Sequence, residues 1–159
     1  MSDRVGTRPR RIAVVGCGGA GKTYAAQALA ARHGLPVVHV DEIVFRGGAL
    51  QAEAEWQAEL NVRADEDAWV IDAMKVSILE HRVDRADTVI FLDLPRRSCY
   101  LGLVRRRKWK RDIANLQFLR WIWRFPHDVR PRILEILERH RRTTDVLVLT
   151  NRRAVRRYL

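Results

Sequence analysis

The chain has 159 residues, 47% of them hydrophobic, and a formal net charge of +11. This length and composition predict one globular domain, residues 1–159, and argue against a disordered chain. We expect a soluble, cytoplasmic protein without membrane contact. No apolar run reaches the roughly 18 to 20 residues of a membrane-spanning helix, no signal peptide is evident, and the two cysteines have neither disulfide-framework nor metal-ligand spacing.

The positive charge is concentrated in the last third of the chain. Residues 1–104 contain 13 Lys and Arg against 14 Asp and Glu, whereas residues 105–159 contain 17 against 5. This asymmetry indicates a partner rich in negative charge, either a polyphosphate or a nucleic acid.

Hydrophobic patterning predicts alternating strands and helices. In chain order, we expect a strand over 12–15, a helix over 22–33, a strand over 36–40, a helix over 51–67, a strand over 68–72, a short helix over 75–84, a strand over 87–93, a helix after Pro95, helices over 115–125 and 129–142, a strand over 145–150 and a short helix within 151–159. Pro126 and Pro131 are expected as helix breaks or first-turn residues. This order predicts an α/β fold, with a five-stranded parallel sheet covered by helices on both faces.

A glycine-rich loop follows the first predicted strand. The sequence Gly16-Cys17-Gly18-Gly19-Ala20-Gly21-Lys22-Thr23 matches the phosphate-loop pattern G-x-x-x-x-G-K-[ST], with a strand before it and a helix after it. Glycines let the backbone turn its N–H groups toward phosphate oxygens, and the helix adds its positive dipole end. We therefore expect Lys22 to bridge the β- and γ-phosphates of ATP or another nucleoside triphosphate, and Thr23 to bind Mg²⁺.

Three aspartates stand at the carboxyl ends of predicted strands, where ligands of parallel sheets gather. Asp72 and Asp93 are both candidates for the carboxylate near the metal, and the residues alone do not rank them. Asp41 closes the second predicted strand and is a candidate contact of the phosphoryl acceptor. The alternative role for each is that of a helix cap or turn residue.

Several segments together resemble a known family. In order, they are the phosphate loop, PVVHVDEI (36–43), DAWVIDAM (67–74), ADTVIFLDLPRRSCYLGLVRR (86–106) and VLVLTNRRAVRRYL (146–159). Over nearly the whole chain they resemble the small adenylate-kinase-like P-loop proteins often labelled DNA topology modulation proteins. The resemblance implies a nucleoside- or nucleotide-kinase fold in which the third strand lies beside the first.

The resemblance also implies residue roles. Asp72 becomes the carboxylate on the Mg²⁺ side, and Asp41 contacts the acceptor. Arg105, Arg106 and Arg107 belong to a lid at about 105–115 that closes over the transferring phosphoryl group. Residues implied to contact the nucleotide are Gly16, Gly18, Gly19, Ala20, Gly21, Lys22, Thr23 and Tyr24.

The chain departs from the family pattern at two places. Asp72 is followed by Ala73-Met74-Lys75 where a stretch like D-G-N-Y is usual, and Tyr24 replaces a second hydroxyl residue such as Ser or Thr. We expect the first departure to affect acceptor recognition more than ATP binding.

The leading hypothesis is an ATP- and Mg²⁺-dependent kinase acting on a small-molecule acceptor. A rival is a nucleic-acid-associated ATPase that uses the basic last third, where cations alternate with Trp109, Trp121 and Trp123. Helical spacing instead places Phe118, Trp121, Ile122 and Phe125 on one buried face, which favours a lid plus core. A further alternative is a protein that binds nucleotide without transferring phosphate.

Overall fold

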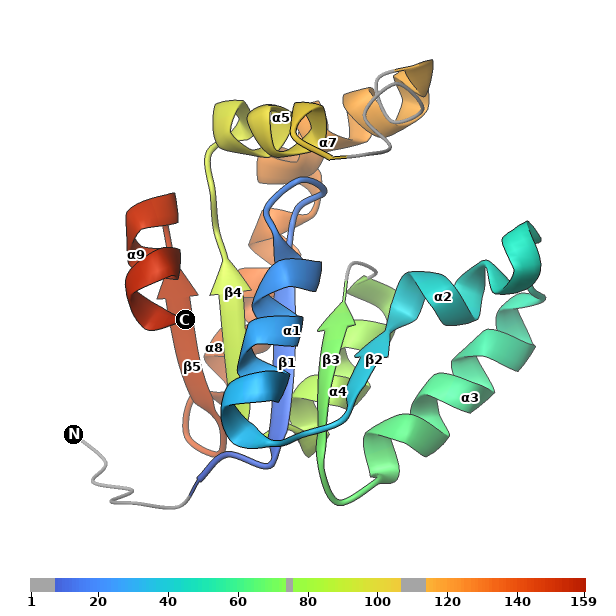
Figure 1. Cartoon of the computed structure of the whole chain (residues 1–159), viewed down its shortest axis with the longest axis vertical. Helices are drawn as coiled ribbons and strands as arrows, with labels where there is room; N and C mark the ends of the chain where they lie inside the picture. The colour runs from blue at the N-terminus through green and yellow to red at the C-terminus, as the bar shows by residue number, and fades with distance from the viewer. Residues whose placement is uncertain (1–7, 74–75, 107–113) are drawn as a thin grey trace.

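The sheet contains five parallel strands in the order β2-β3-β1-β4-β5 (Figure 1). The structure is a computed structural model that describes residues 8–73, 76–106 and 114–159. Its elements are β1 (Arg11–Gly16), α1 (Lys22–His33), β2 (Val37–His39), α2 (Val40–Val44), the 3-10 turn η1 (Arg46–Gly48), α3 (Glu53–Asp65), β3 (Trp69–Ala73), the 3-10 turn η2 (Val76–Ile78), α4 (Leu79–Arg85), β4 (Thr88–Leu92), α5 (Arg96–Val104), α7 (Leu116–Asp128), α8 (Arg130–His140), β5 (Asp145–Leu149) and α9 (Arg152–Tyr158). The predicted fold class is confirmed, and β3 lies beside β1 as the family resemblance implies.

Helices cover both faces of the sheet, with α1 and α9 on one side and α4 and α8 on the other (Figure 1). The central strand β1 is buried from Ile12 to Gly16, because it pairs with β3 and β4 and is covered on both faces. Near-continuous apolar strands of this kind are typical of parallel sheets. Among the described residues, no helix is long and apolar enough to cross a membrane.

Two predicted boundaries are wrong, and the first of them affects the site. The second strand ends at His39, and the chain turns at once into α2, so Asp41 lies in the first turn of a helix and does not end a strand. Pro126 lies inside α7 and does not end it. Proline has no N–H to donate to the carbonyl group of Ile122, so it removes one helical hydrogen bond near the end of α7.

The predicted buried face of the α7 segment is confirmed in its centre. Ile122 and Phe125 are buried, whereas Phe118 and Trp121 are half-buried. Trp121 stacks on Phe118 and contacts Phe125 edge-on, with ring centroids 6.0 and 5.3 Å apart. Helix α7 also contacts the phosphate loop, because a Cβ on Gly18 would lie 2.6 Å from Phe118 Cζ and 3.4 Å from Ile122 Cδ1.

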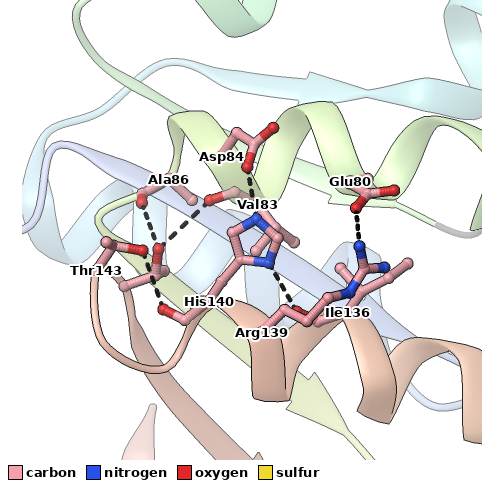
Figure 2. Close-up of polar contacts among 9 residues, drawn as sticks. Glu80, Val83, Asp84, Ala86, Ile136, Arg139, His140 and Thr143 are labelled. Atoms are coloured by element: carbon pink, nitrogen blue, oxygen red, sulfur yellow. Dashed lines mark hydrogen bonds and ion pairs between the residues drawn. The ribbon is translucent and has the colours of Figure 1, made fainter.

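Polar contacts fix α4 against α8 (Figure 2). His140 Nε2 lies 2.5 Å from the Asp84 carboxylate, and its Nδ1 lies 2.7 Å from the Ile136 carbonyl oxygen. One turn along, Arg139 Nη1 donates to Glu80 at 2.6 Å. Because these pairs join the two helices at separate points, α4 is held in a defined position beside the sheet.

Candidate functional site

The phosphate loop joins the carboxyl end of β1 to the start of α1. Gly19 and Gly21 have φ values of 77° and 95°, which lie in the left-handed region that favours glycine. No side chain caps the N-terminus of α1. The N–H groups of the first helical turn are therefore available to phosphate oxygens, as the motif predicts.

Lys22 is buried, and its Nζ donates to the carbonyl oxygen of Cys17 at 2.9 Å. Burial lowers the pKa of this ammonium group. The carboxylates of Asp72 and Asp41 act in the opposite direction, and Arg106 adds to the lowering. Lys22 is therefore within electrostatic range of three other predicted site residues.

Asp72 connects the elements around the loop. Its Oδ2 accepts from His39 Nδ1 at 2.8 Å and from the Thr23 hydroxyl at 3.4 Å, while Oδ1 accepts from the backbone N–H of Val40 at 3.2 Å. The side chain is almost fully buried. Parallel pairing of β2 with β3 sets His39 opposite Asp72, and pairing of β1 with β3 brings the same carboxylate to the loop.

The donor set fits Mg²⁺. Thr23 and Asp72 supply a hydroxyl and a carboxylate, the hard oxygen ligands that Mg²⁺ prefers. Within the described residues there is no group of three or more His, Cys, Asp or Glu side chains that could hold a metal alone.

Asp93 forms an ion pair with Arg130. Its carboxylate accepts two hydrogen bonds from Arg130, each 2.8 Å long. Asp72 lies beside Thr23, whereas Asp93 pairs with Arg130, so the structure separates two carboxylates that the residues alone left unranked and that the resemblance ranked in favour of Asp72.

The predicted lid arginines are placed unequally. Arg105 follows the last residue of α5 and is exposed, and Arg106 is exposed but acts electrostatically on Lys22. Arg107 and most of the predicted lid lie outside the described residues. Tyr24 is on the first turn of α1 with 69% of its surface exposed, so its ring is open to a ligand and does not pack into the core.

Helix α5 packs directly on the phosphate loop. A Cβ built on Gly102 would lie 2.0 Å from the carbonyl oxygen of Gly19, so this approach requires glycine. From the C-terminal helix, Arg152 Nη2 donates to the carbonyl oxygens of Gly19 and Ser98 at 3.1 and 2.7 Å. We did not predict these hydrogen bonds of Arg152 from the sequence. Arg152 is separated from the loop by most of the chain, and the basic run that contains it has no recognisable motif.

The loop cysteine is packed into this contact. Cys17 and Cys99 are both buried, and the Cys99 thiol donates to the carbonyl oxygen of Leu94 at 3.7 Å. The neighbouring Cys99 thiol and burial raise the pKa of Cys17 far above its usual range. Cys17 is therefore a small un-ionised group packed between the loop and α5.

Known proteins resemble this chain in structure and not detectably in sequence. No family model and no curated protein sequence matches it. A shikimate kinase from Bacteroides thetaiotaomicron superposes with a TM-score of 0.60 at 16% identity, covering 94% of this chain and 96% of the other. A shikimate kinase from Acinetobacter baumannii gives 0.56 at 18% identity, covering 94% and 88%.

A gluconokinase from Sinorhizobium meliloti 1021 gives a TM-score of 0.52 at 15% identity, covering 96% of this chain and 95% of the other. These neighbours are shikimate kinases and a gluconokinase, and this chain matches nearly their full length. The chain therefore has the adenylate-kinase-like P-loop kinase fold.

Proposed function

We propose that this protein is an ATP- and Mg²⁺-dependent phosphotransferase that transfers the γ-phosphoryl group to a hydroxyl of a small-molecule acceptor. The observation that carries the proposal is the convergence of a buried lysine, a glycine-rich loop and the Thr23–Asp72 pair at the carboxyl ends of β1 and β3. The kinase activities of the structural neighbours support the same reaction class.

Each residue has a definite task in this proposal. The loop N–H groups and Lys22 bind the phosphates and neutralise the charge that develops during transfer. Thr23 and Asp72 would hold the metal, and bound Mg²⁺ would supply additional positive charge at the phosphates. Asp41, exposed at the start of α2, orients the acceptor hydroxyl.

Of the two lid arginines that the structure describes, Arg106 is the one whose charge acts on Lys22, so we assign it the contact with the phosphates. Equivalent roles for Arg105 and Arg107 stay predictions. The acceptor is a hydroxyl compound of the size that shikimate kinases and gluconokinases phosphorylate, and it binds between β3 and α2.

The test is phosphate transfer from ATP to a panel of nucleosides, nucleotides, sugars and sugar acids. Asp72→Asn should lower kcat by about 10²- to 10³-fold, a loss typical of removing one charge-stabilising group. Asp67→Asn is the matched control, because the side chain of Asp67 is 88% exposed and distant from the loop. Tight ATP binding without transfer to any acceptor would leave only a nucleotide-binding protein.

A further inference from the structure

One arginine is buried beside the site without a matching partner. Arg82 on α4 is only 1% exposed and is the one fully buried arginine in the described part of the chain. Its Nε and Nη1 atoms are enclosed and have no hydrogen-bond partner among the residues that the structure describes. Its burial is unlike that of Lys22, whose ammonium group donates to the loop backbone.

The Arg82 side chain extends toward the catalytic edge of the sheet. Helix α4 follows β3 through η2, so its N-terminus lies at the end of the sheet that carries Asp72. Helical side chains lean toward the N-terminus of their helix, which directs the long Arg82 side chain to that edge. Asp72 is accordingly the carboxylate whose charge acts on the guanidinium.

Asp72 does not complete the pairing. Both of its oxygens already accept hydrogen bonds, from His39 and Thr23 on one oxygen and from the Val40 N–H on the other. Burial lowers the pKa of Arg82 to about 10, and the charge of Asp72 acts in the opposite direction without offsetting the effect of burial. A buried guanidinium without a full set of hydrogen bonds lowers the stability of the folded protein. Apolar residues often replace such groups without loss of stability.

The rest of α4 keeps this side chain in place. The helix is tied to α8 by the contacts of Asp84 with His140 and of Glu80 with Arg139 (Figure 2). Charged groups on rigid elements with unfilled hydrogen-bonding capacity are typical of binding sites.

Building on the proposed kinase activity, we propose that Arg82 recognises an anionic group of the acceptor, a carboxylate or a phosphate ester. The anion enters at the carboxyl end of β3 and pairs with the guanidinium, while the acceptor hydroxyl faces Asp41 and Lys22. Specificity for acids over their neutral counterparts then resides in α4.

Matched acceptor pairs test this assignment without requiring transfer. With the phosphate loop saturated by a non-hydrolysable ATP analogue and Mg²⁺, D-gluconate is compared with D-glucitol, and glucose 6-phosphate with glucose, by calorimetry and thermal shift. Saturation prevents the phosphate ester from binding in the loop itself. We expect binding of the acid and not of the neutral member in at least one pair, and the pair that responds identifies carboxylate or phosphate ester as the preferred anion.

Arg82→Met should weaken binding of that acid by about 10- to 100-fold, the loss expected for a hydrogen bond to a charged group. Its Tm should equal or exceed that of the wild type, because the substitution removes an uncompensated buried charge. Arg82→Lys should bind the acid weakly but keep the preference over the neutral compound. Arg85→Met is the control, since Arg85 is on the same helix but pairs with Asp65 at the surface.

Three outcomes would overturn the inference: equal binding of acid and neutral compound, no binding of either acid, or an Arg82→Met protein that binds the acid normally. A lowered Tm for Arg82→Met with unchanged acid affinity would give Arg82 a purely structural role. Arg82-dependent acid binding without phosphate transfer would leave the inference standing and remove the proposed kinase activity.

Discussion

Whether Gly102→Ala stabilises or destabilises the protein depends on the tertiary structure. Gly102 lies inside α5, where helix propensity alone predicts that alanine would stabilise the protein by about 1 kcal/mol. In the folded protein, however, the new Cβ would lie 2.0 Å from the Gly19 carbonyl oxygen and 2.6 Å from Arg152 Nη2. The structure therefore predicts that Gly102→Ala destabilises the protein.

The size of the destabilisation follows from how far the Gly19 carbonyl oxygen must move to make room for the new Cβ. The contact is about 1.4 Å short of the 3.4 Å at which ordinary van der Waals contact begins, and the atom it meets belongs to the backbone. Overpacking of this kind costs about 1–3 kcal/mol or more, so a net loss of about 2 kcal/mol remains after the propensity gain. For a chain of this size, we expect Tm to fall by about 4–8 °C.

The same displacement should reach the nucleotide site. Moving the Gly19 carbonyl shifts the phosphate loop, so ATP affinity measured by calorimetry should fall together with Tm. Leu101→Ala is the control, because Leu101 is a half-exposed neighbour on α5. A Gly102→Ala protein with unchanged or higher Tm and normal ATP affinity would refute the close approach of α5 to the loop.

Further predictions concern the loop, the sheet edge and the buried charge. Gly18→Ala should cost about 1–2 kcal/mol in denaturant unfolding, because its Cβ would meet Phe118 Cζ at 2.6 Å, and adding Phe118→Leu should recover most of the loss. Asp93→Asn should lower the free energy of unfolding by about 1 kcal/mol, a value kept small because Arg130 is partly exposed to solvent. The substitution should leave ATP affinity unchanged, and a loss of ATP binding would contradict the separate role of Asp93. The stability difference between Arg82→Met and the wild type should shrink above about pH 10, because the folded wild type then releases its buried charge while the unfolded chain retains it. Unfolding titrations of both proteins between pH 8 and about pH 11 would reveal a constant difference if this reasoning is wrong.

The sequence predicted those features that short-range patterns determine. The phosphate loop needs particular residues at adjacent positions, and the buried strands need continuous apolar runs, so both can be found in a single sequence. The order of strands could not be derived in this way. The family resemblance implied only that the third strand lies beside the first, and this pairing of β3 with β1 brings Asp72 to Thr23.

Contacts between distant segments were not predictable. The His39–Asp72 hydrogen bond depends on the register of two strands, and a shift of one residue would turn His39 to the other face. Arg82 lies within an ordinary helical pattern, and only its burial beside Asp72 distinguishes it from surface arginines such as Arg85. No local pattern carries that information.

The charge asymmetry of the chain also changes meaning once the contacts are known. The argument from the net charge of +12 in residues 105–159 assumes that every arginine there is available to a polyanion. Yet Arg130 is paired with Asp93, Arg139 with Glu80, and Arg152 with two carbonyl oxygens behind the phosphate loop. These arginines join α8 and α9 to the sheet, α4 and the loop. These three of the 17 basic residues in the segment therefore hold parts of the fold together, and the net charge does not by itself argue for nucleic-acid binding.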